Sequence, residues 1–170
     1  MSNKGGIAAA LAYVATIVAA NWAVKTYGMV PVGFGLLAPA GVYFAGLAFT
    51  LRDITQDLLG KGTTVAAILV GAGVSYSLGG GRIAVAGAVA FLVSELADFA
   101  VYTPLRERGY LRAVIASNAV GLVIDSVLFL WLAFGSTQFL AGQVVGKAWM
   151  TAAAVAVLLA AKRRRRAVTA

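Results

Sequence analysis

The sequence predicts an all-α integral membrane protein, a bundle of six transmembrane helices with both termini in the cytoplasm. Of the 170 residues, 61% are hydrophobic and 12% are charged, which is about half the charged share of a typical soluble domain. Six segments approach the roughly 20 mainly apolar residues that a helix needs to cross a hydrocarbon core. This composition excludes an ordinary soluble enzyme and a disordered chain.

The predicted spans follow one another closely along the chain. In order, they are residues 7–24, 33–51, 63–78, 83–102, 114–134 and 142–161. An alternative for the first is a signal peptide cleaved after Val18-Ala19-Ala20, although Asn21 and Trp22 continue it to an end typical of a membrane interface. We expect Pro104 to end the fourth helix, because proline cannot continue the hydrogen-bond ladder.

The distribution of basic residues predicts the orientation. With the N-terminus in the cytoplasm, eleven lysines and arginines lie on the cytoplasmic side, Arg52 among them, and Lys25 and Arg82 lie outside. This asymmetry follows the positive-inside rule. Five of the eleven form the run 162–166 directly after the last span. We therefore expect one transmembrane domain over residues 1–161 and a basic cytoplasmic tail over 162–170, rather than a nucleic-acid-binding segment.

Missing residue types exclude several kinds of site. The chain has no cysteine and no histidine. Disulfides, thiolate or imidazole metal ligands and Ser–His catalysis are therefore excluded. We expect no metal, no cofactor and no enzymatic activity.

Polar side chains recur at helical spacing in four of the predicted spans. Residues three or four positions apart share one helix face, and ionisable residues in a membrane usually face a bundle interior or a water-filled cavity. The stripes are Phe49, Asp53 and Asp57; Phe91, Glu95, Asp98 and Tyr102; Asn118, Gly121, Asp125 and Phe129; and Gln143, Lys147 and Thr151. We expect them to enclose a polar cavity between the second, fourth, fifth and sixth helices, with Glu95, Asp98 and Asp125 at its core.

Structural roles stay open for several of these acids. Asp53 and Asp57 fit loop residues, with Asp57 in a solvated ion pair along its own helix. Asp98 lies near enough to the cytoplasmic end to form a bridge with Arg106 or Arg108.

Other residues of the last two spans also have alternatives. Lys147 fits either snorkelling to the interface or neutralising a buried acid. Trp131 and Trp149 fit either a stack on a flat ligand or packing at the membrane interface.

Asp125 and Glu95 lie near the middle of their spans, where an acid marks a functional site by default.

Four stretches between the second and fifth spans resemble a known family. They are Ala38-Pro39-Ala40-Gly41 leading to Phe49-Thr50-Leu51-Arg52-Asp53; Ser94-Glu95-Leu96-Ala97-Asp98-Phe99-Ala100-Val101-Tyr102; Thr103-Pro104-Leu105-Arg106-Glu107-Arg108; and Ser117-Asn118, Gly121, Ile124-Asp125-Ser126 and Phe129. In this order they resemble the queuosine precursor transporter family, also called the vitamin uptake transporter family.

The resemblance implies a six-helix importer of queuosine precursors, the deazaguanine bases used in tRNA modification, in the bacterial inner membrane. A carboxylate offers acceptors that match the adjacent N–H and NH₂ donors of a guanine-like edge. We expect the substrate to be bound by Glu95, Asp98, Asn118 and Asp125. The expected gate or supporting residues are Arg52, Asp53, Phe49, Tyr102 and Lys147. The expected partners are a purine-like small molecule and the lipid bilayer, without nucleic acid.

Three other functions stay open. The chain fits the substrate-binding subunit of an energy-coupling-factor importer of a vitamin or purine, which depends on a shared energising module. A metal-dependent enzyme acting on lipid requires Asp53 and Asp57 to hold Mg²⁺. A small pore or assembly factor does not need central acids, which cost about 2.5–3.5 kcal/mol each in a membrane, so the acids favour a transporter.

Overall fold

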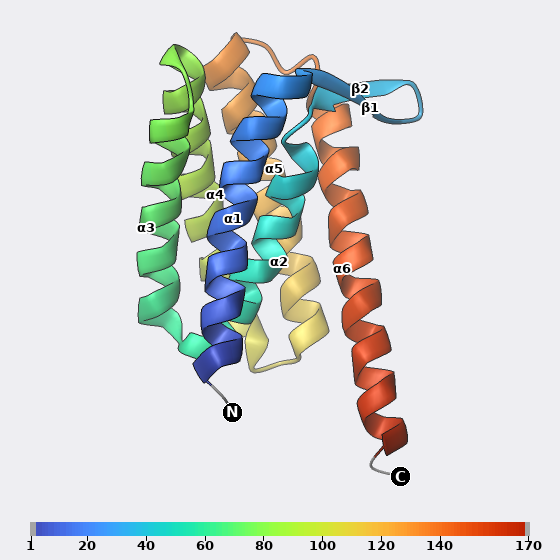
Figure 1. The fold of residues 1–170 in the computed structure, drawn as a ribbon. Helices are drawn as coiled ribbons and strands as arrows, with labels where there is room; N and C mark the ends of the chain where they lie inside the picture. The colour runs from blue at the N-terminus through green and yellow to red at the C-terminus, as the bar shows by residue number, and fades with distance from the viewer. Residues whose placement is uncertain (1–2, 169–170) are drawn as a thin grey trace.

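A computed structural model describes residues 3–168, with side chains over residues 4–160. The described chain forms six helices and a two-stranded sheet (Figure 1). The helices are α1 (Asn3–Tyr27), α2 (Val42–Leu59), α3 (Lys61–Leu78), α4 (Gly81–Arg106), α5 (Tyr110–Phe134) and α6 (Leu140–Val168). The run 162–166 continues α6 as helix, and its side chains lie outside the described part.

A β-hairpin occupies the start of the predicted second span. Strands β1 (Met29–Gly33) and β2 (Leu36–Pro39) pair antiparallel. Between them, Gly33, Phe34 and Gly35 have φ angles of 101°, 54° and 72°, a left-handed conformation that glycine adopts without steric cost. The purely helical prediction for this stretch was therefore wrong, because the glycines allow the chain to turn back on itself.

The bounds of α2 also differ from the prediction. The helix begins at Val42 and continues to Leu59 instead of ending at residue 51. Arg52 and Asp53 thus lie inside the helix and are fully buried, so the alternative of Asp53 as a loop residue was wrong, and Arg52 is a buried charge rather than an exposed one on the cytoplasmic side. α4 likewise continues through Pro104 to Arg106. A proline near the last turn removes one hydrogen bond but leaves little helix to disrupt.

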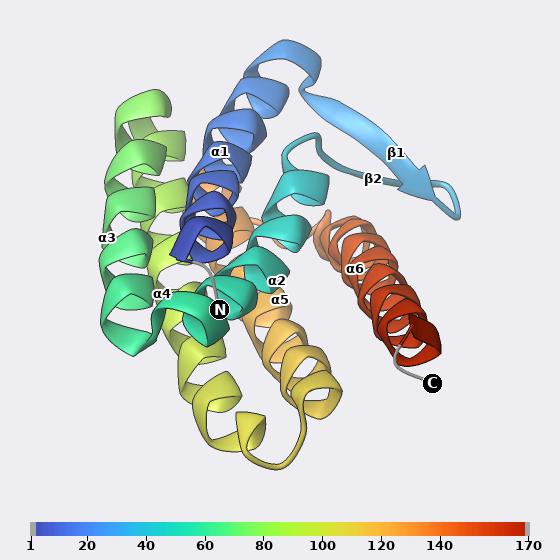
Figure 2. The ribbon, with the colours of Figure 1, turned by 60° about the horizontal axis from the view of Figure 1, so that its bottom comes forward.

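The helices run alternately up and down the bundle. The first residues of α1 and the last of α6 lie at the same end, and the hairpin lies at the other (Figure 1). α4 and α5 pack along each other, and α1 packs against α2 and α3. α6 stands to one side, against α2, α5 and the hairpin (Figure 2).

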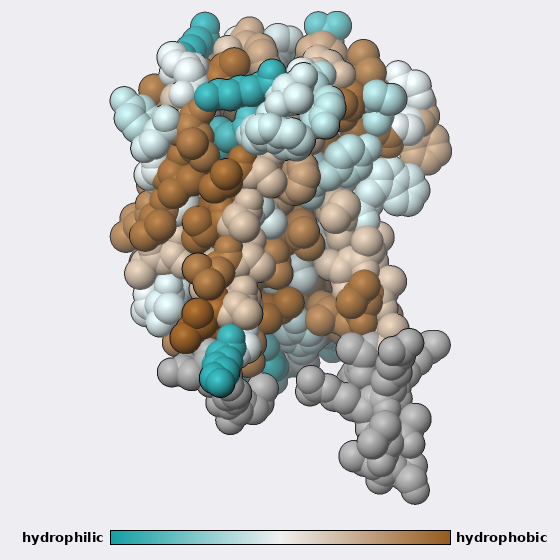
Figure 3. Space-filling model, viewed as in Figure 1, coloured by the Kyte–Doolittle hydropathy of each residue, from teal (hydrophilic) through white to brown (hydrophobic). Residues whose placement is uncertain are grey.

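The outer surface of the bundle is largely apolar. Exposed apolar side chains include Leu11, Leu69 and Val70, and hydrophobic residues cover much of the middle of the face in Figure 3. α1, α4, α5 and α6 are each long and apolar enough to cross a membrane. α2 and α3 have 18 residues each and are not among these four, so the six-span count stays a prediction.

Gly46 allows α2 and α6 to approach closely. A Cβ at this position would lie 2.9 Å from both Cα and the carbonyl oxygen of Lys147. Because backbone atoms cannot move aside as a flexible side chain does, we expect Gly46→Ala to lower the free energy of unfolding by about 1–3 kcal/mol. Denaturation of the purified protein in detergent measures this.

The matched control for that substitution is Gly73→Ala on α3. A Cβ there meets nothing within 4 Å, and alanine favours helix by up to about 1 kcal/mol over glycine. We expect this variant to be as stable as the wild type or more stable. Equal losses in both variants would contradict the close packing of α2 on α6.

The orientation can be tested with single cysteines, because the chain has none of its own. Arg108 follows α4 at the end where the termini lie, and Ser136 follows α5 at the hairpin end. By the positive-inside rule, a membrane-impermeant thiol reagent should label Ser136→Cys in intact cells and Arg108→Cys only after permeabilisation. The reverse pattern would contradict the predicted orientation.

Candidate functional site

A cavity of about 320 Å³ lies in the half of the bundle nearest the hairpin. Its walls are mainly apolar and include four aromatic rings, those of Phe44, Phe49, Phe91 and Phe129. Pockets for small molecules usually have volumes of roughly 300–1,000 Å³ and apolar or aromatic walls with a few polar groups. The cavity therefore has the size and lining suited to a small ligand with a flat apolar surface.

Two carboxylates lie at the deep end of this cavity. Glu95 from α4 and Asp125 from α5 line it, and each is the lining residue of its helix farthest from the hairpin end. At the opposite end the lining includes Lys25 and Gly80, both exposed. The cavity thus reaches the surface at the hairpin end and meets acidic groups inside the bundle.

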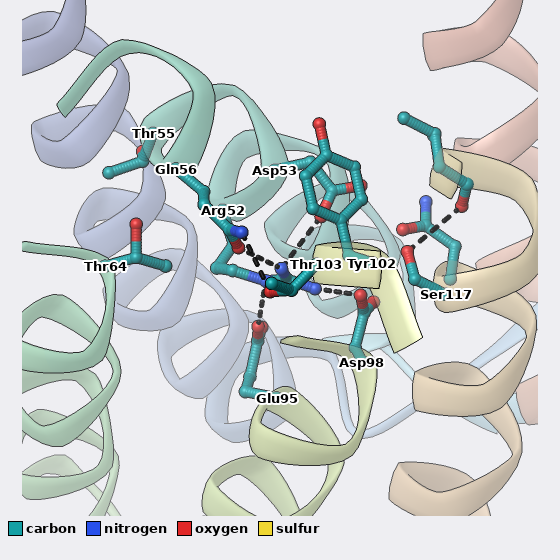
Figure 4. Close-up of polar contacts among 12 residues, drawn as sticks. Arg52, Asp53, Thr55, Gln56, Thr64, Glu95, Asp98, Tyr102, Thr103 and Ser117 are labelled. Atoms are coloured by element: carbon teal, nitrogen blue, oxygen red, sulfur yellow. Dashed lines mark hydrogen bonds and ion pairs between the residues drawn. The ribbon is translucent and has the colours of Figure 1, made fainter. Parts of the chain in front are cut away.

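Directly beyond the cavity, Arg52 forms the centre of a buried ion cluster (Figure 4). Its Nε lies 3.3 Å from Oε2 of Glu95 and its Nη1 lies 3.0 Å from Oδ1 of Asp53, while Nη2 contacts Oδ1 of Asp98. Nη1 also donates to the Gln56 side chain at 3.2 Å. We call Arg52, Asp53, Glu95 and Asp98 the Arg52 cluster.

The Arg52 cluster links α2 to α4 through charge. All four of its side chains are buried to 1% exposure or less. Buried charges are tolerated when they are paired and hydrogen-bonded. Because the guanidinium presents its donors in a fixed plane, it can hold several carboxylates at once, which a lysine ammonium does less well.

A second ion pair joins α6 to α5 at the cavity. Nζ of Lys147 lies 2.5 Å from Oδ2 of Asp125 and 2.8 Å from Oγ of Ser126. The Lys147 side chain is 1% exposed and that of Asp125 is 16% exposed. Of the two roles considered for Lys147, the structure shows the neutralisation of a buried acid.

A family comparison covers the part of this site that α4, α5 and α6 contribute. The family model described as "Putative vitamin uptake transporter" matches residues 74–161, which is just over half of the chain and includes Glu95, Asp98 and Asp125. The chain belongs to the vitamin uptake transporter family. With its long apolar helices, it is a multi-pass membrane transporter of a small molecule. No curated protein and no solved structure is significantly similar to it.

Two of the residues expected to bind substrate lie outside the cavity lining of this transporter. Asp98 belongs to the Arg52 cluster. Asn118 donates to Oγ1 of Thr50 at 3.0 Å and so joins α5 to α2. Gly121 makes room here, since a Cβ would lie 2.8 Å from the Phe49 ring and 3.1 Å from Asp98.

A second polar contact joins α2 to α4 at the end of the bundle opposite the hairpin. Both oxygens of Asp57 accept from Nε of Arg106 at 2.9 Å, and the Tyr102 hydroxyl donates to Asp57 at 3.0 Å. The proposed bridge from Asp98 to Arg106 or Arg108 was therefore wrong: Arg106 binds Asp57, and Asp98 binds Arg52. Tyr102, expected as a gate or supporting residue, lies in this end contact.

α1 provides a wall of the cavity that sequence reasoning missed. Thr16 and Asn21 line it from α1, and Ser75 lines it from α3. The signal that could have found the α1 pair is a polar residue within an otherwise apolar span. Trp131 and Trp149 do not line it and are 61% and 50% exposed, which removes the proposed ligand stack.

Removal of the Arg52 guanidinium should lower the folding stability of the bundle. Arg52→Met leaves three buried carboxylates without their cation, and we expect it to cost about 3–5 kcal/mol of folding free energy. Arg106→Met is the matched control, because the Arg106 side chain is 44% exposed and such pairs contribute about 0–1 kcal/mol. Denaturation in detergent compares the two. Similar losses would contradict the central role of the Arg52 cluster.

Proposed function

We propose that this transporter imports queuosine precursors, the deazaguanine bases, across the bacterial inner membrane, and that the base binds in the cavity at Glu95 and Asp125. The observation that carries the proposal is the position of these two carboxylates at the deep end of a cavity with aromatic walls. The phenylalanines suit the faces of a flat bicyclic base. The carboxylates suit its edge, where N–H groups need acceptors.

In the described contacts, Glu95 and Asp125 each bind a cationic side chain through just one of their two carboxylate oxygens. Arg52 contacts Oε2 of Glu95, whereas Oε1 makes no hydrogen bond of good geometry, although the buried Tyr13 hydroxyl approaches this carboxyl group. Lys147 contacts Oδ2 of Asp125, which remains partly exposed where it lines the cavity. A base in the cavity would donate to Asp125 and pair with Oε1 of Glu95, and leaving a buried polar atom unpaired costs free energy.

The closed end of the bundle supports transport rather than simple binding. The cavity reaches the surface at the hairpin end, which is the predicted outer side, and the Arg52 cluster lies between the cavity and the other end. A base bound from outside would leave towards the cytoplasm after the Arg52 cluster opens. The structure then corresponds to a state that faces outward.

A rescue experiment tests the proposal. The host is a bacterium that makes no queuosine precursor and lacks its own importer, supplied with a limiting cyano or aminomethyl deazaguanine base. We expect the wild-type chain to restore queuosine in tRNA. Asp125→Asn should reduce the rescue at least about tenfold, because a hydrogen bond to a charged group contributes roughly 1.5–3 kcal/mol.

Two further variants serve as controls for the loss of charge. Asp125→Asn/Lys147→Met removes both members of the ion pair, so no unpaired lysine remains, and it should also fail to rescue. Glu107→Gln changes an exposed acid outside the cavity and should rescue fully. Rescue by Asp125→Asn, or no rescue with either base by wild-type protein present in the membrane, contradicts the proposal. Loss of rescue when the host's energising module is deleted favours the energy-coupling-factor alternative.

A further inference from the structure

The interior of the bundle carries more acidic than basic groups. Of the six acidic residues in the chain, four lie in the Arg52 cluster or at the cavity, namely Asp53, Glu95, Asp98 and Asp125. The fully buried basic side chains among the described residues are Arg52 and Lys147. With every group ionised, the interior therefore holds two negative charges in excess.

Among the side chains that the structure describes, no further buried basic group compensates this excess. Lys25 lines the cavity mouth but is exposed, where solvent and salt screen its charge. An uncompensated charge away from water is strongly unfavourable. The interior therefore favours the uptake of positive charge from solution.

Unpaired oxygen atoms show where such a charge can bind. Oε1 of Glu95, Oδ2 of Asp98 and Oδ2 of Asp53 are buried and have no hydrogen-bond partner. An ionised carboxylate oxygen can only accept, whereas a protonated one becomes a donor. The space between these carboxylates is taken by the Arg52 guanidinium, so a metal ion would have to displace it. A proton needs a single oxygen.

We propose that Glu95 is a proton-binding site that couples import to the proton gradient, an inference that rests on the proposed function. Glu95 is the member of the Arg52 cluster that also lines the cavity. A proton entering from the outer solution therefore reaches Glu95 before the other members of the Arg52 cluster. Once protonated, Oε1 of Glu95 donates to an acceptor on the base, such as its carbonyl oxygen, while Asp125 accepts from the N–H edge, so the proton and the substrate act on one side chain.

Charged and titratable groups approach Glu95 from several helices. They are Tyr13 on α1, Arg52 and Asp53 on α2, Asp98 on α4, and Asp125 on α5, which is paired with Lys147 on α6. The carboxylates among them favour protonation of Glu95, whereas Arg52 opposes it. The set therefore holds three other carboxylates and two cations, and a proton on Glu95 lowers its net negative charge.

The coupling step moves one proton in each cycle. A hydronium ion in the cavity gives its proton to Oε1 of Glu95, forming an O–H bond and leaving water. The neutral carboxyl attracts Nε of Arg52 less strongly, which loosens the contact between α4 and α2 beneath the cavity. After the bundle opens inward, the proton passes to water on the cytoplasmic side. A neutral base is thus accompanied by one positive charge.

Infrared difference spectroscopy of the purified full chain in detergent tests the site without any substrate. We expect the carbonyl band of a protonated carboxyl group to appear as the pH is lowered and to disappear as it is raised. The band should be absent in Glu95→Gln and unchanged in Glu107→Gln, which removes an exposed acid. No such band in the wild type, or a band that persists in Glu95→Gln, overturns the proposal.

Uptake into proteoliposomes tests the coupling with the labelled cyano deazaguanine base as the probe. An outside-acid gradient of one pH unit should drive about a tenfold accumulation for one proton per base, and an inside-negative potential should increase it. Glu95→Gln should show the same uptake with and without the gradient, whatever its absolute rate, while Glu107→Gln keeps the ratio. Accumulation driven by a sodium gradient and indifferent to pH overturns the proposal.

The two measurements separate the coupling site from the substrate. If the wild type shows neither uptake nor exchange of the base, the proposed function fails, and the infrared band still decides whether Glu95 holds a proton. If the base is imported with no effect of pH or potential, the proposed function stands and the proton coupling is overturned.

Discussion

The buried guanidinium of Arg52 is the interaction on which the rest of the bundle depends. It binds carboxylates from its own helix and from α4 at a depth where each of these groups alone would be strongly unfavourable. This compensation lets α2 continue as a helix through residues that hydropathy assigns to a loop. It also sets the rotation of α2 against α4, because each nitrogen of the planar guanidinium binds a different partner.

The Arg52 cluster divides the bundle into two unlike halves. On the hairpin side the helices leave a cavity with Glu95 and Asp125 at its deep end. On the other side Asp57, Arg106 and Tyr102 hold α2 and α4 together. A protein that moves a solute across a membrane needs a binding site open to one side and a closure towards the other, and an ion cluster is a closure that added charge can loosen.

α6 contacts the cavity region through an ion pair and a close backbone approach. Lys147 binds Asp125 across the α5 interface, and Gly46 brings α2 against the backbone at Lys147. Near the hairpin, Nε1 of Trp149 donates to the carbonyl of Val32 at 3.1 Å. A ligand that contacts Asp125 therefore acts on the ion pair that positions α6, so occupation of the cavity and the position of this helix are physically linked.

The sequence by itself determined the membrane class, the six helices and the inward faces that bring Glu95 and Asp125 to one cavity, because hydropathy and helical spacing are local properties. The tertiary structure alone decided that residues 29–39 form a hairpin, that Arg52 is buried and that α1 lines the cavity. A local window assigns a charged residue to a loop. Its burial depends on carboxylates about 45 residues away in the sequence, and such compensation exists only after the helices have packed.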